Sequence, residues 1–173
     1  MDTIVLIGYM GAGKSSVAAA LGRKLHLKVH DTDACIEARS GMTISNMFRD
    51  CGEAYFRDQE TSLLKELKEE GFEGILSTGG GMPLREENRE LLRSVGKVFY
   101  LKASPASIAK RLSGDTTRPL LAGAKDMAEK ERRIADMLSA RAAAYEAAAD
   151  EIIDTDTKNI SKCVEEILQK LTK

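Results

Sequence analysis

The sequence is poor in the residues that build metal centres and disulfide frameworks. Its 173 residues include only two histidines and three cysteines, and no two cysteines form a C-x-x-C pair. Two histidines are too few for a histidine-based metal site. An odd number of scattered cysteines is typical of free thiols in a reducing compartment. We therefore expect neither a zinc site nor a disulfide framework.

Long apolar runs and a strong charge of one sign are also missing. No apolar stretch approaches the roughly 18 residues needed to cross a membrane, and the formal net charge of −1 gives no sign of a nucleic-acid-binding surface. A signal peptide would have to include the glycine-rich segment after residue 7, so we expect no export signal and a cytoplasmic protein. Because no long apolar stripe is left over, we expect a monomer without membrane or nucleic-acid partners.

Short apolar runs alternate with helical stretches along the chain, which is the pattern of a parallel sheet flanked by helices. A helix is expected over residues 14–25, and further helices reach residue 70 with breaks at Gly41 and Gly52 and a cap at Thr43. One α/β domain is predicted, with ligands beyond the carboxyl ends of its strands. The expected strands are residues 3–7, 28–31, 74–77, 97–101 and 151–153.

A phosphate-binding motif follows the first expected strand. Residues 8–15, G-Y-M-G-A-G-K-S, fit the P-loop pattern G-x-x-x-x-G-K-[ST] between a strand and a helix. Glycines let successive backbone N–H groups turn toward phosphate oxygens, and the helix start adds its positive end. We expect Lys14 to reach the β- and γ-phosphates of ATP and Ser15 to bind Mg²⁺. The motif predicts the phosphate donor but not the reaction.

Two carboxylates follow the second expected strand. Asp31 and Asp33 stand two apart where that strand ends, so both side chains can point the same way. One could hold the Mg²⁺ shell while the other accepts a proton from an acceptor hydroxyl. The alternative is a solvated turn with a helix cap.

Three glycines and two arginines are further candidates. Consecutive glycines at residues 79–81 follow the third expected strand and indicate that something approaches the backbone closely. Arg57 and Glu60 are three apart on an expected helix, and Arg141 and Tyr145 are four apart. Each pair could equally belong to a solvated helix face.

The segment from Leu112 to Ala128 differs from the rest of the chain. Glycine, proline and small polar residues are concentrated in it around Arg118. We interpret it as a mobile element that closes over a bound nucleotide. The alternative is an ordinary surface loop.

Taken together, these segments resemble the shikimate kinase family along nearly the whole chain. The resemblance implies a three-layer P-loop fold with a five-stranded parallel sheet of order 2-3-1-4-5, flanked by helices, and a lid over about residues 112–125. It also implies transfer of the γ-phosphate of ATP to the 3-hydroxyl of shikimate, a step toward chorismate and the aromatic amino acids. The motifs that carry it are G-Y-M-G-A-G-K-S-S at 8–16, D-T-D at 31–33, G-E-A-Y-F-R-D-Q-E at 52–60, S-T-G-G-G at 77–81, T-R-P-L-L at 117–121 and R-A-A-A-Y-E at 141–146.

For the acceptor, the resemblance assigns roles residue by residue. Asp33 would bind and polarise the acceptor hydroxyl, and Arg57 and Arg141 would clamp the carboxylate. A helical region of about residues 33–61 would bind shikimate. The backbone contacts to the ring would come from Gly79, Gly80 and Gly81.

For ATP and the metal, the resemblance places Asp31 beside Ser15, holding Mg²⁺ through water. Arg118 would come down with the lid onto the phosphates, and Arg111 would lie against the adenine, with residues 154–158 on its other side. The groups expected to act in catalysis are Lys14, Asp33 and Arg118. The expected ATP-binding residues are Gly11, Ala12, Gly13, Lys14, Ser15, Ser16, Arg111, Arg118 and Lys158.

Two other functions are compatible with a P-loop. Another small-metabolite kinase, similar to gluconate kinase, should lack the combination of D-T-D, three glycines and two arginines. A P-loop protein that only senses a ligand should have lost Lys14, Asp33 or Arg118, and all three are present. A GTPase is disfavoured because the N-K-x-D motif for guanine is missing.

Overall fold

A parallel sheet lies at the centre of the computed structural model, which describes residues 3–113 and 123–173. Its five strands have the order β2-β3-β1-β4-β5, and every neighbouring pair is parallel. This is the order implied by the resemblance, and each strand begins and ends within one residue of its predicted bounds. The strands are β1 (Ile4–Ile7), β2 (Val29–Asp31), β3 (Ile75–Ser77), β4 (Lys97–Lys102) and β5 (Glu151–Asp154).

Burial decreases from the middle of the sheet to its edges. All four residues of β1 are fully buried, because helices cover both faces of a central parallel strand. The edge strands are more open: Val29 on β2 is 41% exposed and Ile152 on β5 is 43% exposed. This explains why β1 forms an unbroken apolar run in the sequence, whereas β2 and β5 contain polar residues.

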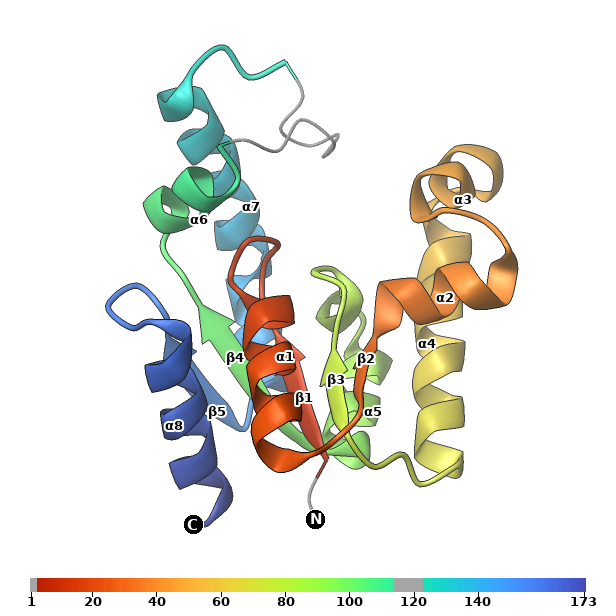
Figure 1. The fold of residues 1–173 in the computed structure, drawn as a ribbon. Coiled ribbons are helices and arrows are strands. Elements are labelled where there is room, and N and C mark those ends of the chain that lie inside the picture. The colour runs from red at the N-terminus through yellow and green to blue at the C-terminus, as the bar shows by residue number, and fades with distance from the viewer. Residues whose placement is uncertain (1–2, 114–122) are drawn as a thin grey trace.

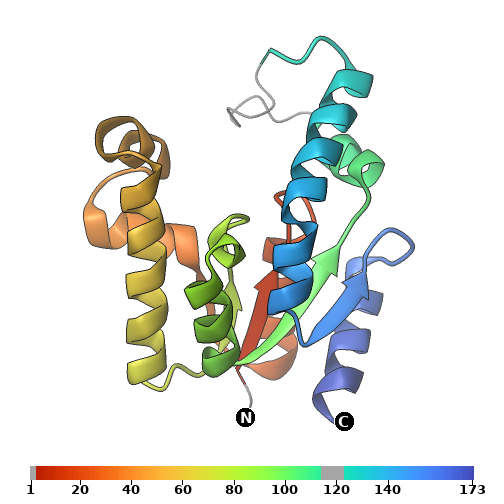
Figure 2. The same cartoon turned by 180° about the vertical axis from the view of Figure 1, so that it is seen from behind.

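Helices form a layer on each face of the sheet. Helices α1 (Lys14–Leu25) and α8 (Ile160–Leu171) cover one face (Figure 1). The opposite face is covered by α4 (Glu53–Glu69), α5 (Glu86–Val95) and α7 (Met127–Ala148) (Figure 2). The arrangement confirms the predicted three-layer α/β fold.

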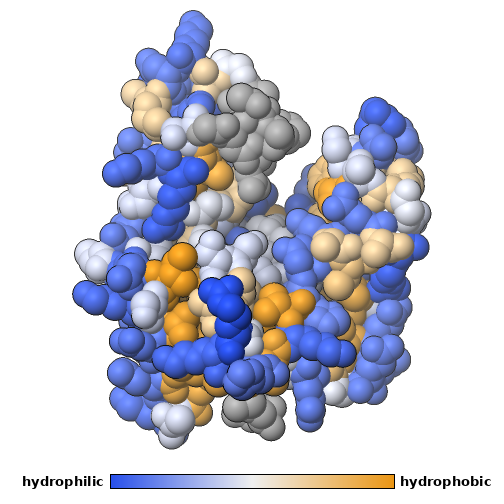
Figure 3. Space-filling view, in the orientation of Figure 1, coloured by the Kyte–Doolittle hydropathy of each residue, from blue (hydrophilic) through white to orange (hydrophobic). Residues whose placement is uncertain are grey.

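Shorter elements lie beyond the carboxyl ends of the strands. They are the helices α2 (Thr32–Ser40), α3 (Ile44–Cys51) and α6 (Pro105–Arg111) and the 3₁₀ turn η1 (Met82–Leu84). In Figure 1, α3 and α6 stand on opposite sides of the loop that follows β1. The molecular surface is notched between these two projections (Figure 3). The strands therefore end beneath a cleft bordered by α2 and α3 on one side and by α6 and α7 on the other.

Two predictions concern the chain as a whole. Within residues 3–113 and 123–173, no helix is both long and apolar enough to cross a bilayer. Cys35, Cys51 and Cys163 all carry free thiols, as predicted.

The helical breaks fall where the sequence predicts them. Helix α2 ends at Gly41 and α3 ends at Gly52. Thr43 caps α3, because its Oγ1 accepts a hydrogen bond from the backbone N–H of Asn46 at 3.1 Å. An N-cap of this kind satisfies one of the N–H groups that a helix start leaves without a partner.

Replacing this cap should lower stability measurably. Thr43→Ala removes the acceptor for the Asn46 N–H and should reduce the free energy of unfolding by about 1 kcal/mol. Thr43→Ser keeps the hydroxyl and is the matched control. Urea unfolding followed by circular dichroism measures both variants. An alanine variant that unfolds at the wild-type midpoint would show that this cap contributes nothing.

Candidate active site

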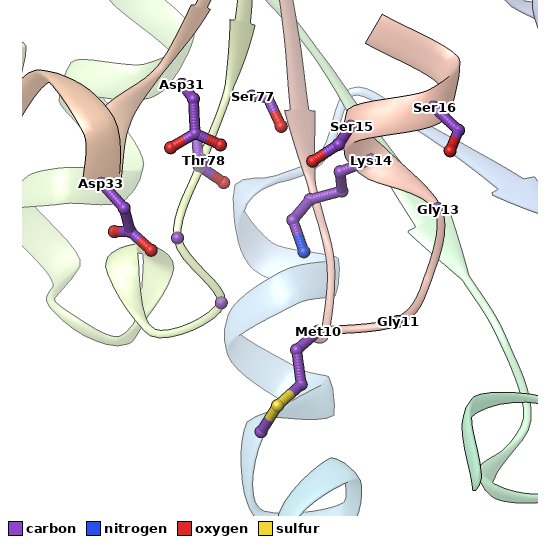
Figure 4. Close-up of a pocket in the computed structure, with 12 residues that line it drawn as sticks. Met10, Gly11, Gly13, Lys14, Ser15, Ser16, Asp31, Asp33, Ser77 and Thr78 are labelled. Carbon is purple, nitrogen blue, oxygen red and sulfur yellow. The ribbon is translucent and has the colours of Figure 1, made fainter. Parts of the chain in front are cut away.

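The P-loop joins β1 to α1 and lines a cavity at the carboxyl end of the sheet (Figure 4). Gly13, at the N-cap of α1, has a φ of 97°, which glycine adopts without steric cost, and no side chain caps this helix start. Lys14 donates from Nζ to the carbonyl oxygens of Gly8 at 2.6 Å and Tyr9 at 2.9 Å. An uncapped helix start beside an ammonium group suits phosphate oxygens.

This P-loop cavity brings the predicted phosphate and metal residues together. Lys14, Ser15 and Asp31 all line it. Two residues that the sequence analysis did not single out, Ser77 and Thr78, line it as well, because β3 ends there. Their position directly before the three glycines was the available signal. The lining residues are Met10, Gly11, Gly13, Lys14, Ser15, Ser16, Asp31, Asp33, Ser77, Thr78, Gly79 and Gly80.

The local structure of the D-T-D motif differs from the prediction. Asp31 ends β2 and caps α2, with its Oδ1 accepting from the N–H of Ala34 at 3.0 Å, whereas Asp33 lies in the first turn of α2. Strand alternation is therefore not the reason that the two side chains share a cavity, since Asp33 is not on the strand. The helix-cap alternative is correct for Asp31. Both carboxylates still line the P-loop cavity, because the chain changes from strand to helix beside it.

Asp33 is an unusual carboxylate. Its Oδ1 is buried and has no hydrogen-bond partner among the described residues. Burial raises the pKa of Asp33 and the nearby charge of Asp31 raises it further, while Lys14 acts in the opposite direction. A carboxylate with a raised pKa is a better proton acceptor near neutral pH than an ordinary one. A buried oxygen without a hydrogen-bond partner lowers the stability of the fold unless a ligand donates a hydrogen bond to it.

A second cavity, of about 240 Å³, adjoins the first. We call it the acceptor cavity. Arg57 reaches it from α4 and Arg141 from α7, so the two predicted arginines meet although they are far apart in the sequence. Its wall also contains three apolar residues, Ile44, Phe48 and Phe56, which lie in the expected acceptor-binding region of about residues 33–61 but were given no individual role. The lining residues are Met10, Asp33, Ile44, Phe48, Phe56, Arg57, Glu60, Gly79, Gly80, Gly81 and Arg141.

Two of the three glycines, Gly79 and Gly81, are needed because side chains of the protein itself occupy the space where a Cβ would lie. A Cβ on Gly79 would lie 2.6 Å from Oδ1 of Asp33, and a Cβ on Gly81 would overlap the guanidinium of Arg57. The predicted close approach to the backbone is therefore confirmed, and Asp33 and Arg57 are the approaching groups. Any larger residue would displace one of them.

Comparison with known proteins agrees with this geometry. A family model described as shikimate kinase matches residues 10–172. A shikimate kinase from Enterococcus faecalis is 42% identical over 173 residues, with 99% of each chain covered. This chain belongs to the shikimate kinase family. Among solved structures, shikimate kinase from Acinetobacter baumannii in complex with shikimate is 34% identical with a TM-score of 0.88, over 99% of this chain and 93% of that one. The enzyme from Bacteroides thetaiotaomicron is 35% identical, also with a TM-score of 0.88, over 99% of each chain.

A buried ion pair lies in the wall of this shikimate kinase site. Nη1 of Arg57 is 2.6 Å from Oε1 of Glu60, and the two side chains are 13% and 0% exposed. The pair is therefore not part of a solvated helix face. Oε2 of Glu60 is buried without a hydrogen-bond partner among the described residues. Burial raises the pKa of Glu60 to about 7, against the opposing effect of Arg57.

Arg111 connects the P-loop to the segment after β5. Its guanidinium donates to the carbonyl oxygens of Gly11 at 3.1 Å and Thr155 at 3.4 Å. Lys158 forms an ion pair with Glu166 at 2.6 Å. Arg111, Thr155 and Lys158 line a third cavity beside the P-loop, so the residues expected near adenine are brought together. That cavity is lined by Ala12, Gly13, Ser16, Val17, Arg111, Thr155, Lys158, Asn159, Ile160 and Cys163.

Some predicted residues lie outside the structural description. Arg118 and most of the expected lid fall within residues 114–122, which are not among the described residues. The catalytic role of Arg118 and the lid therefore stay predictions.

A divalent metal is expected in an ATP-using family, and the donors present fit one. No group of three or more His, Cys, Asp or Glu residues that could hold a metal ion occurs in residues 3–113 and 123–173. Ser15 and Asp31 face the same cavity, and one oxygen of Asp31 is engaged by the helix cap. A cation held there would need phosphate oxygens and water to complete its shell. Mg²⁺ accepts that kind of site.

The protonation of Glu60 should be visible in the pH dependence of stability. Its pKa is 4.5 in the unfolded chain and about 7 in the folded protein, so between these values only the folded protein holds the proton. The free energy of unfolding of the wild type, relative to Glu60→Gln, should therefore fall as pH rises from 4.5 to 7, by at most about 1.4 kcal/mol per pH unit.

Chemical denaturation at a series of pH values measures this difference. Glu53→Gln is the control, because Glu53 also pairs with Arg57, at 3.3 Å, but its side chain is 63% exposed. A wild type that gains stability over Glu60→Gln as pH rises would show that Glu60 is ionised throughout and that its pairing with Arg57 outweighs burial.

Proposed function

We propose that this chain transfers the γ-phosphate of ATP to the 3-hydroxyl of shikimate, giving shikimate 3-phosphate and ADP. One observation carries the proposal: the P-loop cavity and the acceptor cavity share a wall. Met10, Asp33, Gly79 and Gly80 line both cavities. A phosphate donor on the P-loop and an alcohol in the acceptor cavity would therefore meet at Asp33.

On the donor side, the P-loop backbone and Lys14 hold the β- and γ-phosphates, as in other P-loop enzymes. Ser15 would ligate Mg²⁺ and Asp31 would hold it through water. An ion bound there would neutralise charge on the phosphates. Arg111 and Lys158 lie on the adenine side of the nucleotide.

On the acceptor side, Arg57 and Arg141 bind the carboxylate of shikimate, since planar guanidinium groups offer paired donors that match a carboxylate. The backbones of Gly79, Gly80 and Gly81 contact the ring. Asp33 accepts the proton of the 3-hydroxyl while the oxygen forms its bond to the γ-phosphorus, and the bridging bond breaks to release ADP. Its raised pKa and unpaired Oδ1 suit that role.

The chain would act as one kinase domain over residues 1–173, with an acceptor-binding region over about residues 33–61. A lid of about residues 112–125 would bring Arg118 to the phosphates, where a late-arriving cation stabilises charge in the transition state. Closure would also exclude water, which competes with the acceptor hydroxyl. We place this kinase in the cytoplasm as a monomer.

The acceptor that supports ADP release identifies the reaction. ADP release, measured by a coupled assay with ATP and Mg²⁺, should be rapid with shikimate and near background with gluconate or a nucleoside monophosphate. A reaction without acceptor gives the ATPase background. ADP release with gluconate instead of shikimate would indicate the other small-metabolite kinase. No release with any acceptor would indicate a ligand sensor.

Asp33→Asn tests the proposed base. The amide keeps the shape of the side chain but cannot accept the proton, so we expect turnover to fall by about 10²- to 10⁴-fold. The dissociation constant for ATP, measured by calorimetry, should change little. Asp58→Asn is the matched control, because Asp58 lies on α4, is 67% exposed and pairs with Arg85 at 2.7 Å. Turnover near wild type in the Asp33 variant would remove Asp33 from the mechanism.

A further inference from the structure

A buried phenol lies behind the acceptor cavity. Tyr145, near the end of α7, is 0% exposed, and its hydroxyl donates to the carbonyl oxygen of Gly80 at 2.6 Å. The two residues are 65 positions apart in the sequence. The Gly80 carbonyl belongs to the backbone segment that forms the shared wall of the two cavities. The position of that wall therefore depends on a side chain of α7.

The same phenol faces Arg141. The two residues are four apart on α7, so their side chains lie one turn apart on one face of the helix. The guanidinium of Arg141 is close enough to lower the pKa of Tyr145, against the larger effect of burial. A guanidinium only donates hydrogen bonds, so the phenol can turn its lone pairs toward Arg141 while it donates its proton to Gly80.

Arg141 is oriented by its surroundings on two further sides. Its guanidinium carbon lies 5.9 Å from the ring centroid of Tyr9. Its Nη1 also lies beside the Gly80 backbone, 3.6 Å from the point where a Cβ of that residue would stand. Burial raises the pKa of Tyr145, so the phenol keeps its proton at neutral pH and can donate to Gly80.

Other contacts hold the ends of the glycine segment. The N–H of Gly79 donates to Oγ1 of Thr32 at 2.9 Å, and Nδ2 of Asn88 donates to the carbonyl of Met82 at 3.0 Å. Neither contact involves α7. Tyr145 holds the middle of the segment, at Gly80, from a different element, α7.

We propose that Tyr145 is a positioning residue for the acceptor, holding Arg141 and the Gly80 backbone in the arrangement that receives the carboxylate and ring of shikimate. The inference rests on the proposed function. Tyr145 does not line the acceptor cavity. It acts through Arg141 and Gly80 and takes no part in proton or phosphoryl transfer.

Tyr145→Phe removes the hydroxyl and keeps the ring. The Michaelis constant for shikimate should rise up to about tenfold, the upper end of the effect of losing one hydrogen bond. The Michaelis constant for ATP and the melting temperature should stay close to wild type. Equal changes in both Michaelis constants with a lower melting temperature would mean a purely structural role and would overturn the proposal. An unchanged constant for shikimate would overturn it too.

Tyr100→Phe is the matched control. The ring of Tyr100 lies 5.1 Å from that of Tyr145, and Tyr100 is 2% exposed, but it lines a separate cavity between β4, α6 and α7. Removing its hydroxyl should leave both Michaelis constants unchanged. A shift for shikimate as large as that of Tyr145→Phe would attribute the effect to general repacking of the rings and would overturn the proposal.

A double-mutant cycle with Arg141→Lys tests whether Tyr145 acts through Arg141. Lysine cannot reproduce the guanidinium contacts, so the effect of Tyr145→Phe should be smaller in that background than in the wild type. Fully additive effects would contradict action through Arg141. The wild type is assayed alongside the variants. If the wild type is active on shikimate and the Michaelis constants of Tyr145→Phe are unchanged, this inference alone is overturned. If the wild type is inactive on shikimate, both proposals are overturned.

Discussion

The acceptor half of the site depends on the close contact between side chains and the bare backbone of residues 79–81. Asp33 from α2 and Arg57 from α4 occupy space where a Cβ would otherwise lie, and Tyr145 from α7 reaches the backbone between them. Asp33 and Arg57 can approach the segment this closely only because Gly79 and Gly81 have no side chains. Each helix then presents one functional group to the same small volume.

Charge in that volume is balanced within the protein. Arg57 already pairs with Glu60 at 2.6 Å, and a buried oxygen of Asp33 and another of Glu60 have no partner among the described residues. Unpaired buried oxygens destabilise a fold, and natural proteins keep such features at functional sites. The continuous core under the sheet offsets that cost. Burial raises the pKa of Glu60 to about 7, so near neutral pH its negative charge opposes an incoming carboxylate less than that of an ordinary glutamate.

The strands and the P-loop could be predicted closely because short-range patterns determine them. Burial of β1 on both faces produces an apolar run, and Thr43 caps α3 through a contact three residues away. The D-T-D motif was interpreted wrongly in its local geometry, since spacing of two fits a strand, while Asp31 also makes an ordinary N-cap. Residue preferences alone do not decide whether Asp31 continues a strand or caps a helix.

The roles of Glu60 and Tyr145 could not be read from the sequence. Each stands in a motif at helical spacing from an arginine, and the same spacing occurs on solvated faces. What distinguishes them is burial, at 0% exposure for both residues. That burial arises where α4 and α7 pack beside residues 79–82, far away in the sequence. Tertiary packing, which no local pattern encodes, decides whether such a pair is structural or part of a site.

The wall shared by the two cavities has a consequence for inhibition. Because Met10, Asp33, Gly79 and Gly80 border both cavities, an occupant of one lies next to an occupant of the other. A single compound that carries a phosphate mimic and a carboxylated ring on a short linker could engage both halves at once. Its second contact would then be intramolecular, with an effective concentration in the millimolar range for a short flexible linker. Two weak fragments would become one tight ligand.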